Sequence, residues 1–239
     1  MKKLAILLFC FAFGSIAAQE KINQTDAQGR KHGIWKKTYA NGQLRYEGRF
    51  NHGVEVDTFK FYFEDGNLKA VNYFRGGGEV YSWQYGGESQ LAAEGKYQGT
   101  KRDSVWTFYD IEGNVLSRES YDQDAKDGVS VTYFDNGKKA ETLHWQDGQR
   151  QGEWRQNYES GKPKAKGQYA DGKLHGEVTY FYTNGKPHIK GQYHKGKMHG
   201  TWYFFDEFMQ VEKKEEWRYG RKQEDEEDKK EADEAPKEE

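Results

Sequence analysis

One position recurs through this chain at an almost constant interval, and that interval constrains the fold more than any other feature. Counted from Trp35, steps of 24, 24, 23 and then 24 residues reach Phe59, Trp83, Trp106, Ser130, Trp154, Val178 and Trp202. A period of this length is typical of repeat proteins, in which each unit buries its apolar surface against its neighbours. We therefore expect about eight repeats of 24 residues.

Three further positions keep the same period. A glycine stands seven residues after the recurring position at Gly42, Gly66, Gly113, Gly137, Gly161 and Gly185. An aromatic ring stands fifteen residues after it at Phe50, Phe74, Tyr121, Trp145, Tyr169, Tyr193 and Trp217, with Tyr97 in the short third unit. A glycine stands two residues before it at Gly33, Gly128, Gly152, Gly176 and Gly200. Several columns with one period make chance an inadequate explanation.

Each unit has the pattern of a β-hairpin. Residues 176–182 form an aromatic and β-branched run, and Asn184-Gly185 follows it. Asn-Gly favours a two-residue type I′ turn, with positive φ at both central residues. A second strand, Ile189 to Tyr193, and a second turn at Lys195-Gly196 complete the unit. The third unit, between Gly78 and Gly99, lacks the Asn-Gly turn and one residue, so we expect a bulge or a distorted hairpin there.

The repeated unit resembles the MORN repeat, specifically a bacterial variant with the pattern Gly-x-Trp-x-x-Tyr-Tyr-x-x-Gly. The residues that carry the match include Gly33-Ile34-Trp35, residues 104–109, Gly152-Glu153-Trp154 and residues 200–205. The resemblance implies an all-β fold, an elongated antiparallel meander of tandem hairpins in a single-layer, curved sheet. It also implies a scaffold function, and bacterial members of this variant often carry an "antitoxin-like" label.

Strand alternation assigns the aromatic side chains to faces. One face is expected to hold Phe59, Phe61, Phe63, Val178, Tyr180, Tyr182, Trp202 and Phe204, and the other Tyr62, Tyr109, Tyr133, Phe181 and Phe205. In a single-layer sheet, rings from successive units supply burial that a second layer would otherwise give. The same rings could also form an exposed groove for a peptide, glycan or lipid headgroup. Tyr180, Tyr182, Trp202 and Phe204 are the candidate binding surface.

Composition separates the two ends of the chain from its body. Of 239 residues 16% are aromatic and 34% hydrophobic, which fits many short strands and tight turns. Residues 1–18 have the layout of a signal peptide: Lys2 and Lys3, an apolar stretch of about ten residues and a small-residue cleavage region. Phe9 precedes Cys10, the single cysteine, which does not fit a lipoprotein signal. We expect a linker at 19–31, repeats at 32–220, and a solvated, disordered acidic tail at 221–239.

The search for catalytic and metal-binding patterns identifies no site. His32, His175 and His199 occupy equivalent repeat positions, which are expected two strands apart, about 9.5 Å. That spacing is too wide for one zinc ion. Residues 122–128 resemble a calcium loop, but Lys126 stands where a ligand is needed. No hydrolase, nucleotide-binding or zinc-protease motif occurs. We expect neither an enzyme nor a cofactor.

The charge and the architecture limit the classes of partner that we expect. Without Lys2, Lys3 and the tail, the body has 30 basic and 29 acidic residues, which argues against nucleic acid. The signal-peptide layout predicts an exported protein, periplasmic or secreted. No apolar run after the signal peptide is long enough to span a membrane as a helix. The preferred hypothesis is a non-catalytic protein-interaction scaffold. The alternatives are a module for cell-envelope glycan or phospholipid headgroups, and an antitoxin or immunity partner. Exposed end strands make a homodimer possible.

Overall fold

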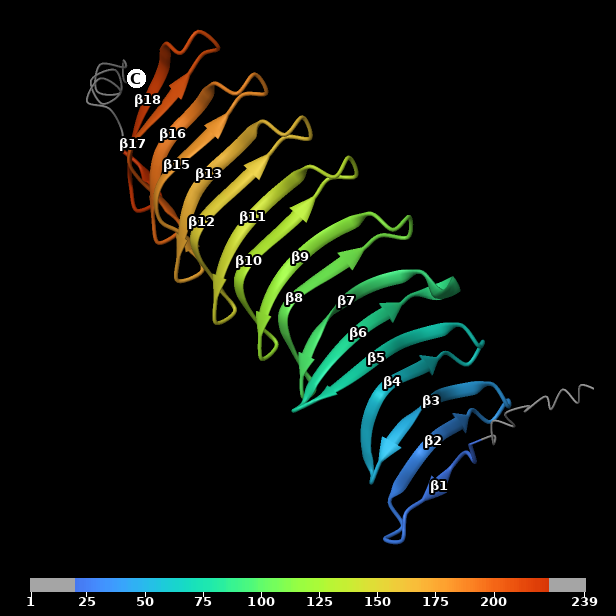
Figure 1. Ribbon diagram of the computed structural model, residues 1–239. Helices are drawn as coiled ribbons and strands as arrows, with labels where there is room; N and C mark the ends of the chain where they lie inside the picture. The colour runs from blue at the N-terminus through green and yellow to red at the C-terminus, as the bar shows by residue number, and fades with distance from the viewer. Residues whose placement is uncertain (1–19, 224–239) are drawn as a thin grey trace, which may run out of the picture.

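A single open antiparallel sheet makes up the fold, with strands that follow one another in chain order (Figure 1). The computed structural model describes residues 20–223. It contains nineteen strands, of which sixteen have six residues or more. Every strand pair is antiparallel, and all the long strands bend in the same sense (Figure 1). The all-β meander of hairpins expected from the repeats is confirmed.

The strands are as follows. The first half comprises β1 (Gln24–Thr25), β2 (Lys31–Thr38), β3 (Leu44–Asn51), β4 (Val54–Tyr62), β5 (Leu68–Gly76), β6 (Glu79–Tyr85), β7 (Leu91–Gln98), β8 (Lys101–Tyr109) and β9 (Val115–Asp122). The second half comprises β10 (Ala125–Tyr133), β11 (Lys139–Gln146), β12 (Gln149–Asn157), β13 (Pro163–Ala170), β14 (Lys173–Leu174), β15 (Gly176–Phe181), β16 (Pro187–His194), β17 (Lys197–Phe205), β18 (Val211–Arg218) and β19 (Arg221–Lys222).

The expected ends of the repeat body differ slightly in the structure. β1 lies within the segment expected to be a linker, and it pairs with β2. β19 lies at the start of the expected tail, and it pairs with the end of β18. The expected signal peptide, Cys10 and residues 224–239 of the tail lie outside the described residues.

The turn at Asn184-Gly185 differs from the type I′ turn expected there. At Asn184-Gly185 only the glycine has a positive φ, 92°. The Gly185 N–H donates to the Tyr182 carbonyl, and the Tyr182 N–H donates to the Lys186 carbonyl. These bonds define a three-residue loop in which a type I turn is followed by a left-handed glycine, and not a type I′ turn. The type I′ geometry occurs at the other end, where Lys195 and Gly196 have φ of 50° and 80°.

The glycine two residues before the recurring position sits at a β-bulge. Gly33, Gly152 and Gly200 have φ of 77°, 87° and 71° there. Asp57 and Ser104 take the same place with φ of 59° and 60°. A left-handed conformation costs a residue with a Cβ about 1–2 kcal/mol, which explains why most units use glycine.

The third unit keeps its inward side chains on the same face as those of its neighbours, because its bulge lies on a different strand. The register pairs Ser82, and not Trp83, with Gly95, which stands thirteen residues further on. Every other recurring residue has the same offset to its partner, as in the Trp106–Glu119 pair. The irregularity lies on β5, between Phe74 and Gly76, instead of on β6. The assignment of Trp83 to the recurring column was therefore wrong, because the missing residue falls before it.

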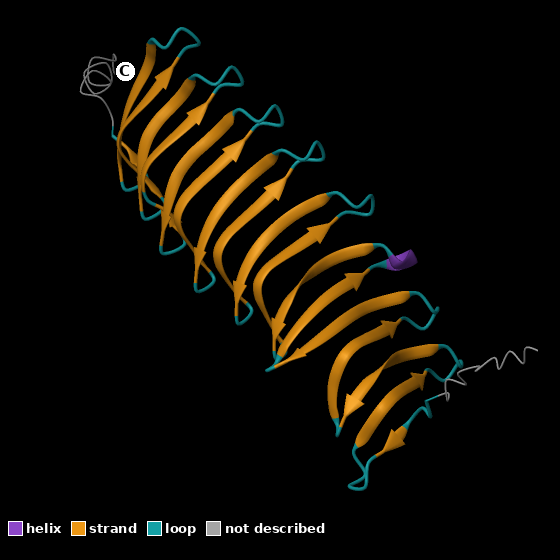
Figure 2. Ribbon diagram, viewed as in Figure 1, coloured by secondary structure: helices purple, strands orange, loops and turns teal. Residues whose placement is uncertain are grey.

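The expected distortion of this unit also appears at its other end. A short 3-10 turn, Gly87–Ser89, replaces the glycine loop between β6 and β7 (purple in Figure 2). Glu88 and Ser89 both have positive φ, 56° and 60°. The Ser89 hydroxyl accepts a hydrogen bond of 2.9 Å from the Leu68 N–H, which ties the turn to β5.

The core lies on one side of the sheet, which we call the ring face. Its large buried side chains are Phe50, Phe59, Trp106, Tyr121, Trp154 and Trp202. Trp106 and Phe59 are only 1% exposed, so neighbouring units cover them without a second layer. Three rings lie directly on glycines of the preceding strand: Phe59 on Gly48, Trp106 on Gly95 and Trp202 on Gly191. A Cβ on any of these glycines would stand 2.3 Å from a ring carbon, so we call each glycine a ring seat.

Neighbouring hairpins are also joined at both edges of the sheet. At one edge, tyrosine hydroxyls donate to carbonyls 23 residues further on, from Tyr39 to Tyr62, Tyr158 to Phe181 and Tyr182 to Phe205, at 2.6–2.8 Å. At the other edge, glycine N–H groups of the type I′ turns donate to the preceding hairpin, from Gly53 to Lys31 and from Gly196 to Leu174. These bonds connect the units independently of the strand ladders.

Candidate functional site

The four candidate residues lie together at the C-terminal end of the ring face, and they differ in exposure. Trp202 is 3% exposed and covers its ring seat Gly191, so it supports the surface from below. Phe204, two residues later on β17, is partly buried and packs against the same apolar cluster. The Lys213 ammonium lies 5.7 Å from the Phe204 ring centre.

The two candidate tyrosines are held by different contacts. The Tyr180 hydroxyl lies 3.4 Å from that of Tyr193, and burial raises the pKa of Tyr180. The Tyr182 hydroxyl donates to the Phe205 carbonyl at 2.6 Å, and its ring stacks on His188 with centres 4.2 Å apart. Both rings are half-buried. Their outer surfaces are therefore available, while their hydroxyls are engaged by the protein.

Basic side chains cover the aromatic column along one edge of the ring face. Lys31 lies 4.6 Å from the Phe50 ring centre, and Arg102 lies 4.1 Å from that of Tyr121. Further along the sheet, Lys126 lies over Trp145 and Arg150 over Tyr169. In the last two units the corresponding residues are Leu174 and Met198, which join the apolar cluster. Glu55 takes this place in the second unit, so the edge changes from charged to apolar toward the C-terminus.

The opposite face carries a continuous row of side chains that crosses the sheet at right angles to the strands. Paired residues in successive ladders define it. From β2 to β18, the members of this cross-strand row are Lys36, Glu47, Lys60, Val71, Trp83, Glu94, Thr107, Arg118, Val131, Thr142, Arg155, Lys166, Thr179, Lys190, Tyr203 and Lys214. β14 contributes no member, because β13 pairs directly with β15.

The two halves of the cross-strand row differ in charge. In the first half, Lys36 forms an ion pair of 3.0 Å with Glu47, and this lysine lowers the pKa of the Glu47 carboxyl. The second half, from Arg118 onward, contains cations but no carboxylate. Its five basic members, Arg118, Arg155, Lys166, Lys190 and Lys214, are all exposed. We call this part the basic half-row.

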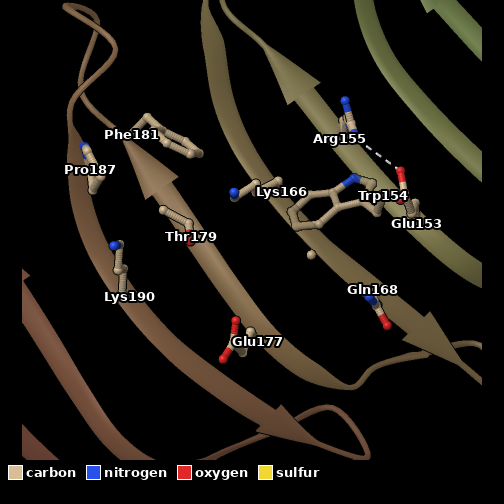
Figure 3. Close-up of a pocket in the computed structure, with 11 residues that line it drawn as sticks. Glu153, Trp154, Arg155, Lys166, Gln168, Glu177, Thr179, Phe181, Pro187 and Lys190 are labelled. Atoms are coloured by element: carbon tan, nitrogen blue, oxygen red, sulfur yellow. Dashed lines mark hydrogen bonds and ion pairs between the residues drawn. The ribbon is translucent and has the colours of Figure 1, made fainter.

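A shallow depression of about 440 Å³ lies in the basic half-row (Figure 3). Its lining includes Lys166 and Lys190, on the strands that flank Thr179 and Phe181 (Figure 3). Lys166 lies 5.9 Å from the centre of the Phe181 ring. Glu153 pairs with Arg155 at 3.1 Å on one side of the depression. The site offers cations beside an aromatic surface, which suits binding of an anionic group rather than catalysis.

The histidines form small ring clusters at the type I′ turns. His194 lies between His175 and His199, with ring centres 5.2 and 5.8 Å away. Tyr219 packs on His199 at 4.7 Å. Among residues 20–223, no group of three His, Cys, Asp or Glu side chains is arranged to hold a metal ion. In this part of the chain no helix is both long and apolar enough to cross a membrane.

Two features of these surfaces are absent from the sequence analysis. The ring seats Gly48, Gly95 and Gly191 form a glycine column together with Gly167. This column stands thirteen residues after the recurring position, or twelve after Trp83 in the third unit, and could have been found by the same counting. The cross-strand row could not, because it depends on the register of each pair and on the position of each bulge.

Comparison with known proteins gives one family match. The model of the family described as "MORN repeat variant" matches residues 31–52, 126–147, 150–171 and 174–195. No curated protein matches the chain.

Two solved structures show weak similarity. One is the Tc holotoxin pore of Photorhabdus luminescens, with 13% identity over 82% of this chain and a TM-score of 0.22. This chain spans 13% of that toxin chain. The other is a porin-like protein from Bacteroides uniformis, with 10% identity, coverage of 79% of this chain and 91% of that chain, and a TM-score of 0.20. These values carry no argument about fold or function.

The four matched segments each begin near the bulge glycine or the basic residue before it and end at a type I′ turn. They therefore coincide with the hairpins of the sheet, from β2–β3 to β15–β16. On the evidence of these matches and of the hairpin meander that contains them, the chain belongs to the MORN repeat proteins, in the form described as the MORN repeat variant.

Proposed function

We propose that this chain is an exported, non-catalytic scaffold that binds a protein partner along its extended sheet. The observation that carries the proposal is the ring face, on which half-buried aromatic rings stand in line from hairpin to hairpin with no second layer above them in the described residues. Aromatic side chains on a rigid support are typical of the centres of protein interfaces, because they bury much apolar surface at a small cost in entropy.

The C-terminal end of the ring face is the best-supported contact region. Tyr180, Tyr182 and Phe204 are half-buried there. Trp202 supports this part of the ring face by packing directly on Gly191. The rings are preorganised, since hydrogen bonds or packing already hold them. A partner that binds to them would lose little conformational freedom on the side of this protein.

The test compares two neighbouring residues of β17 that point to opposite faces. Phe204→Ala removes a ring from the ring face, and Phe205→Ala removes one from the opposite face. The exported protein would be crosslinked in its native cell envelope and the products identified by mass spectrometry. We expect Phe204→Ala to abolish the main protein adduct and Phe205→Ala to preserve it, with both variants folded by circular dichroism. An adduct that survives Phe204→Ala and Tyr180→Ala together would reject the ring face as the contact region.

Export forms a separate part of the proposal. It rests on the signal-peptide layout of residues 1–18. Mass spectrometry of the N-terminus of the protein recovered from the envelope or the medium would check it, with Gln19 expected as the first residue. A protein that retains Met1 and stays in the cytoplasm would contradict export without affecting the binding proposal.

A second candidate function is binding of an anionic glycan or lipid headgroup. The depression between Lys166 and Lys190 favours it, because cations beside the Phe181 ring fit an anionic group with an apolar side. Incubation of the protein with envelope fractions before and after protease treatment separates the two functions. Retention on protease-treated envelopes, lost in Lys166→Gln/Lys190→Gln, would favour the glycan or headgroup over a protein partner.

A further inference from the structure

The basic half-row has more positive charge than the structure around it neutralises. Lys166, Lys190 and Lys214 are exposed, and within residues 20–223 none of them forms an ion pair. Their nearest aromatic neighbours are Phe181, Phe205 and Tyr203, at 5.7–5.9 Å. The three ammonium groups therefore lie along one line with one side apolar, a layout that suits an extended acidic peptide.

The same chain supplies such a peptide next to this line. Five successive acidic residues, Glu224 to Asp228, begin directly after Gln223, the last described residue. The Gln223 N–H donates to the Glu216 carbonyl at 2.8 Å, which fixes the exit of the chain on the outer edge of β18. Glu216 is two residues from Lys214, so the acidic segment starts beside the end of the basic half-row.

The acidic segment is similar in length to the distance from Lys214 to Lys166. Four strand steps separate Lys214 from Lys166, through β17, β16 and β15 to β13. At about 4.8 Å per step they span about 19 Å. Five extended residues cover about 17 Å at 3.3 Å per residue. The backbone of the acidic segment is thus shorter than the path from the outer edge of β18 to Lys166, and the flexible four-carbon stems of the lysines supply the remaining reach.

We propose that residues 224–228 of this chain lie across the basic half-row, with their carboxylates on Lys214, Lys190 and Lys166. The segment lies toward Phe181 and Phe205, because the other side of the line carries Glu153, Glu177 and Glu216. This contact does not depend on the proposed partner. It does mean that any acidic ligand must displace residues 224–228 to reach the lysines.

The first test is zero-length crosslinking of the full chain with a carbodiimide, which joins only carboxyl and amino groups in contact. Peptide mapping should find Lys214, Lys190 and Lys166 joined to residues 224–228. Lys36 and Lys60 are the internal control, since they belong to the same row but alternate with Glu47. In 1 M NaCl, where screening acts over about 3 Å, the adducts should fall about threefold or more.

Three crosslinking outcomes would overturn the proposal. One is equal labelling of Lys36 and Lys166. Another is labelling confined to the turn lysines Lys173 and Lys197. The third is adducts of mixed mass from a mixture of isotopically labelled and unlabelled chains, which would assign the acidic segment to a second copy.

The second test measures competition, and it uses full-length variants. In the neutralised variant, Glu224, Glu226 and Glu227 become Gln, and Asp225 and Asp228 become Asn. A fluorescent octaglutamate peptide should bind this variant at least about fivefold more tightly than the unaltered chain, because the lysines are free. Adding Lys166→Glu/Lys190→Glu to the neutralised variant should abolish binding, and adding Lys36→Glu/Lys60→Glu should not. Equal affinity of the neutralised and unaltered chains would refute the proposal.

Discussion

Two ring seats in different parts of the sheet show how one local geometry is stabilised in two ways. Trp106 on β8 covers Gly95, and Trp202 on β17 covers Gly191. In both cases a tyrosine of the preceding unit meets the indole edge to face, with centres 4.8 Å apart for Tyr97 and 5.2 Å for Tyr193. The immediate contacts of the two indole rings are thus nearly the same.

The surroundings of the two seats differ. The Trp106 indole N–H donates to the Lys96 carbonyl at 3.0 Å, and the Lys96 ammonium pairs with Asp103 at 2.8 Å. The Trp202 indole N–H is buried and has no hydrogen-bond partner within the described residues. Trp202 belongs instead to a longer apolar cluster that extends back to Leu143. One seat is therefore surrounded by polar contacts, and the other depends on apolar contacts.

This difference teaches that the glycine seat is the constant element, while its surroundings can vary. A bare glycine lets a large ring approach the backbone of the next strand, and this packing needs no second layer. Polar or apolar side chains can then complete the burial. The following predictions test the comparison, from the largest expected effect to the smallest.

A methyl group on a ring seat should have the largest effect. Gly191→Ala and Gly95→Ala would each place a Cβ 2.3 Å from an indole carbon. We expect each to lower the free energy of unfolding by about 3 kcal/mol, measured by urea denaturation. Gly167→Ala is the control, because its Cβ would stand 3.4 Å from Trp154, and it should cost less than about 1 kcal/mol. A similar cost at Gly167 and Gly191 would mean that ring contact does not define the seat.

Replacing each indole by phenyl should separate the two seats. Phe59 on Gly48 shows that a phenyl ring fits this geometry. Trp106→Phe removes the hydrogen bond to the Lys96 carbonyl, whereas Trp202→Phe removes a buried N–H that has no partner among residues 20–223. We expect Trp106→Phe to cost at least about 1 kcal/mol more than Trp202→Phe in urea denaturation. The reverse order would show that apolar volume, and not the hydrogen bond, distinguishes the seats.

A glycine at the bulge beside Trp106 should stabilise the protein. Ser104 has a φ of 60°, where the corresponding residue beside Trp202 is Gly200 with a φ of 71°. Ser104→Gly relieves the left-handed conformation, partly offset by the greater freedom of glycine in the unfolded chain, for a gain of up to about 1 kcal/mol. Gly176→Ser is the converse control, since φ there is 77° and the space around its Cβ is open. The melting temperature should rise for the first variant and fall for the second.

The pH dependence should give the smallest effect, and it concerns one carboxyl beside each seat. The Lys96 ammonium holds the pKa of Asp103 below its ordinary value of 3.8, and the Lys213 ammonium holds the pKa of Glu215 below 4.5. Each folded-state pKa lies below the unfolded value, so the stabilisation is complete above the unfolded pKa. It is lost as the pH falls through the folded pKa.

Urea midpoints measured from pH 7 down to pH 2 would test this dependence. Lys96→Gln and Lys213→Gln should each lower the urea midpoint at pH 7. Each should also reduce the fall of the midpoint between pH 7 and pH 2, which we call the acid limb. An unchanged acid limb in both variants would show that these pairs do not contribute.

The repeat period and the hairpin fold could be predicted because they depend on local chemistry. Glycines at turns and rings at fixed spacing specify the fold within one unit. The turn at Asn184-Gly185 was mistaken because Asn-Gly also fits the last two residues of a three-residue loop. Trp83 was misplaced because counting cannot locate a missing residue within a unit.

The candidate surfaces could be predicted only in part. Tyr180, Tyr182 and Phe204 share a face by simple alternation, so their proximity followed from the pattern. The burial of Trp202 depends on Gly191 across the strand, which alternation does not reveal. The basic half-row depends on nine strands, from β9 to β18, staying in register, and one shifted bulge would move Lys166 away from Lys190.

The displaced bulge of the third hairpin has a consequence for the length of a unit. A strand that loses one residue would normally turn its inward side chains outward. In this hairpin the irregularity on β5 restores the alternation, so the next strands continue in phase. Units of 23 and 24 residues are therefore interchangeable in this architecture, and single deletions near a turn can be accommodated without loss of the array.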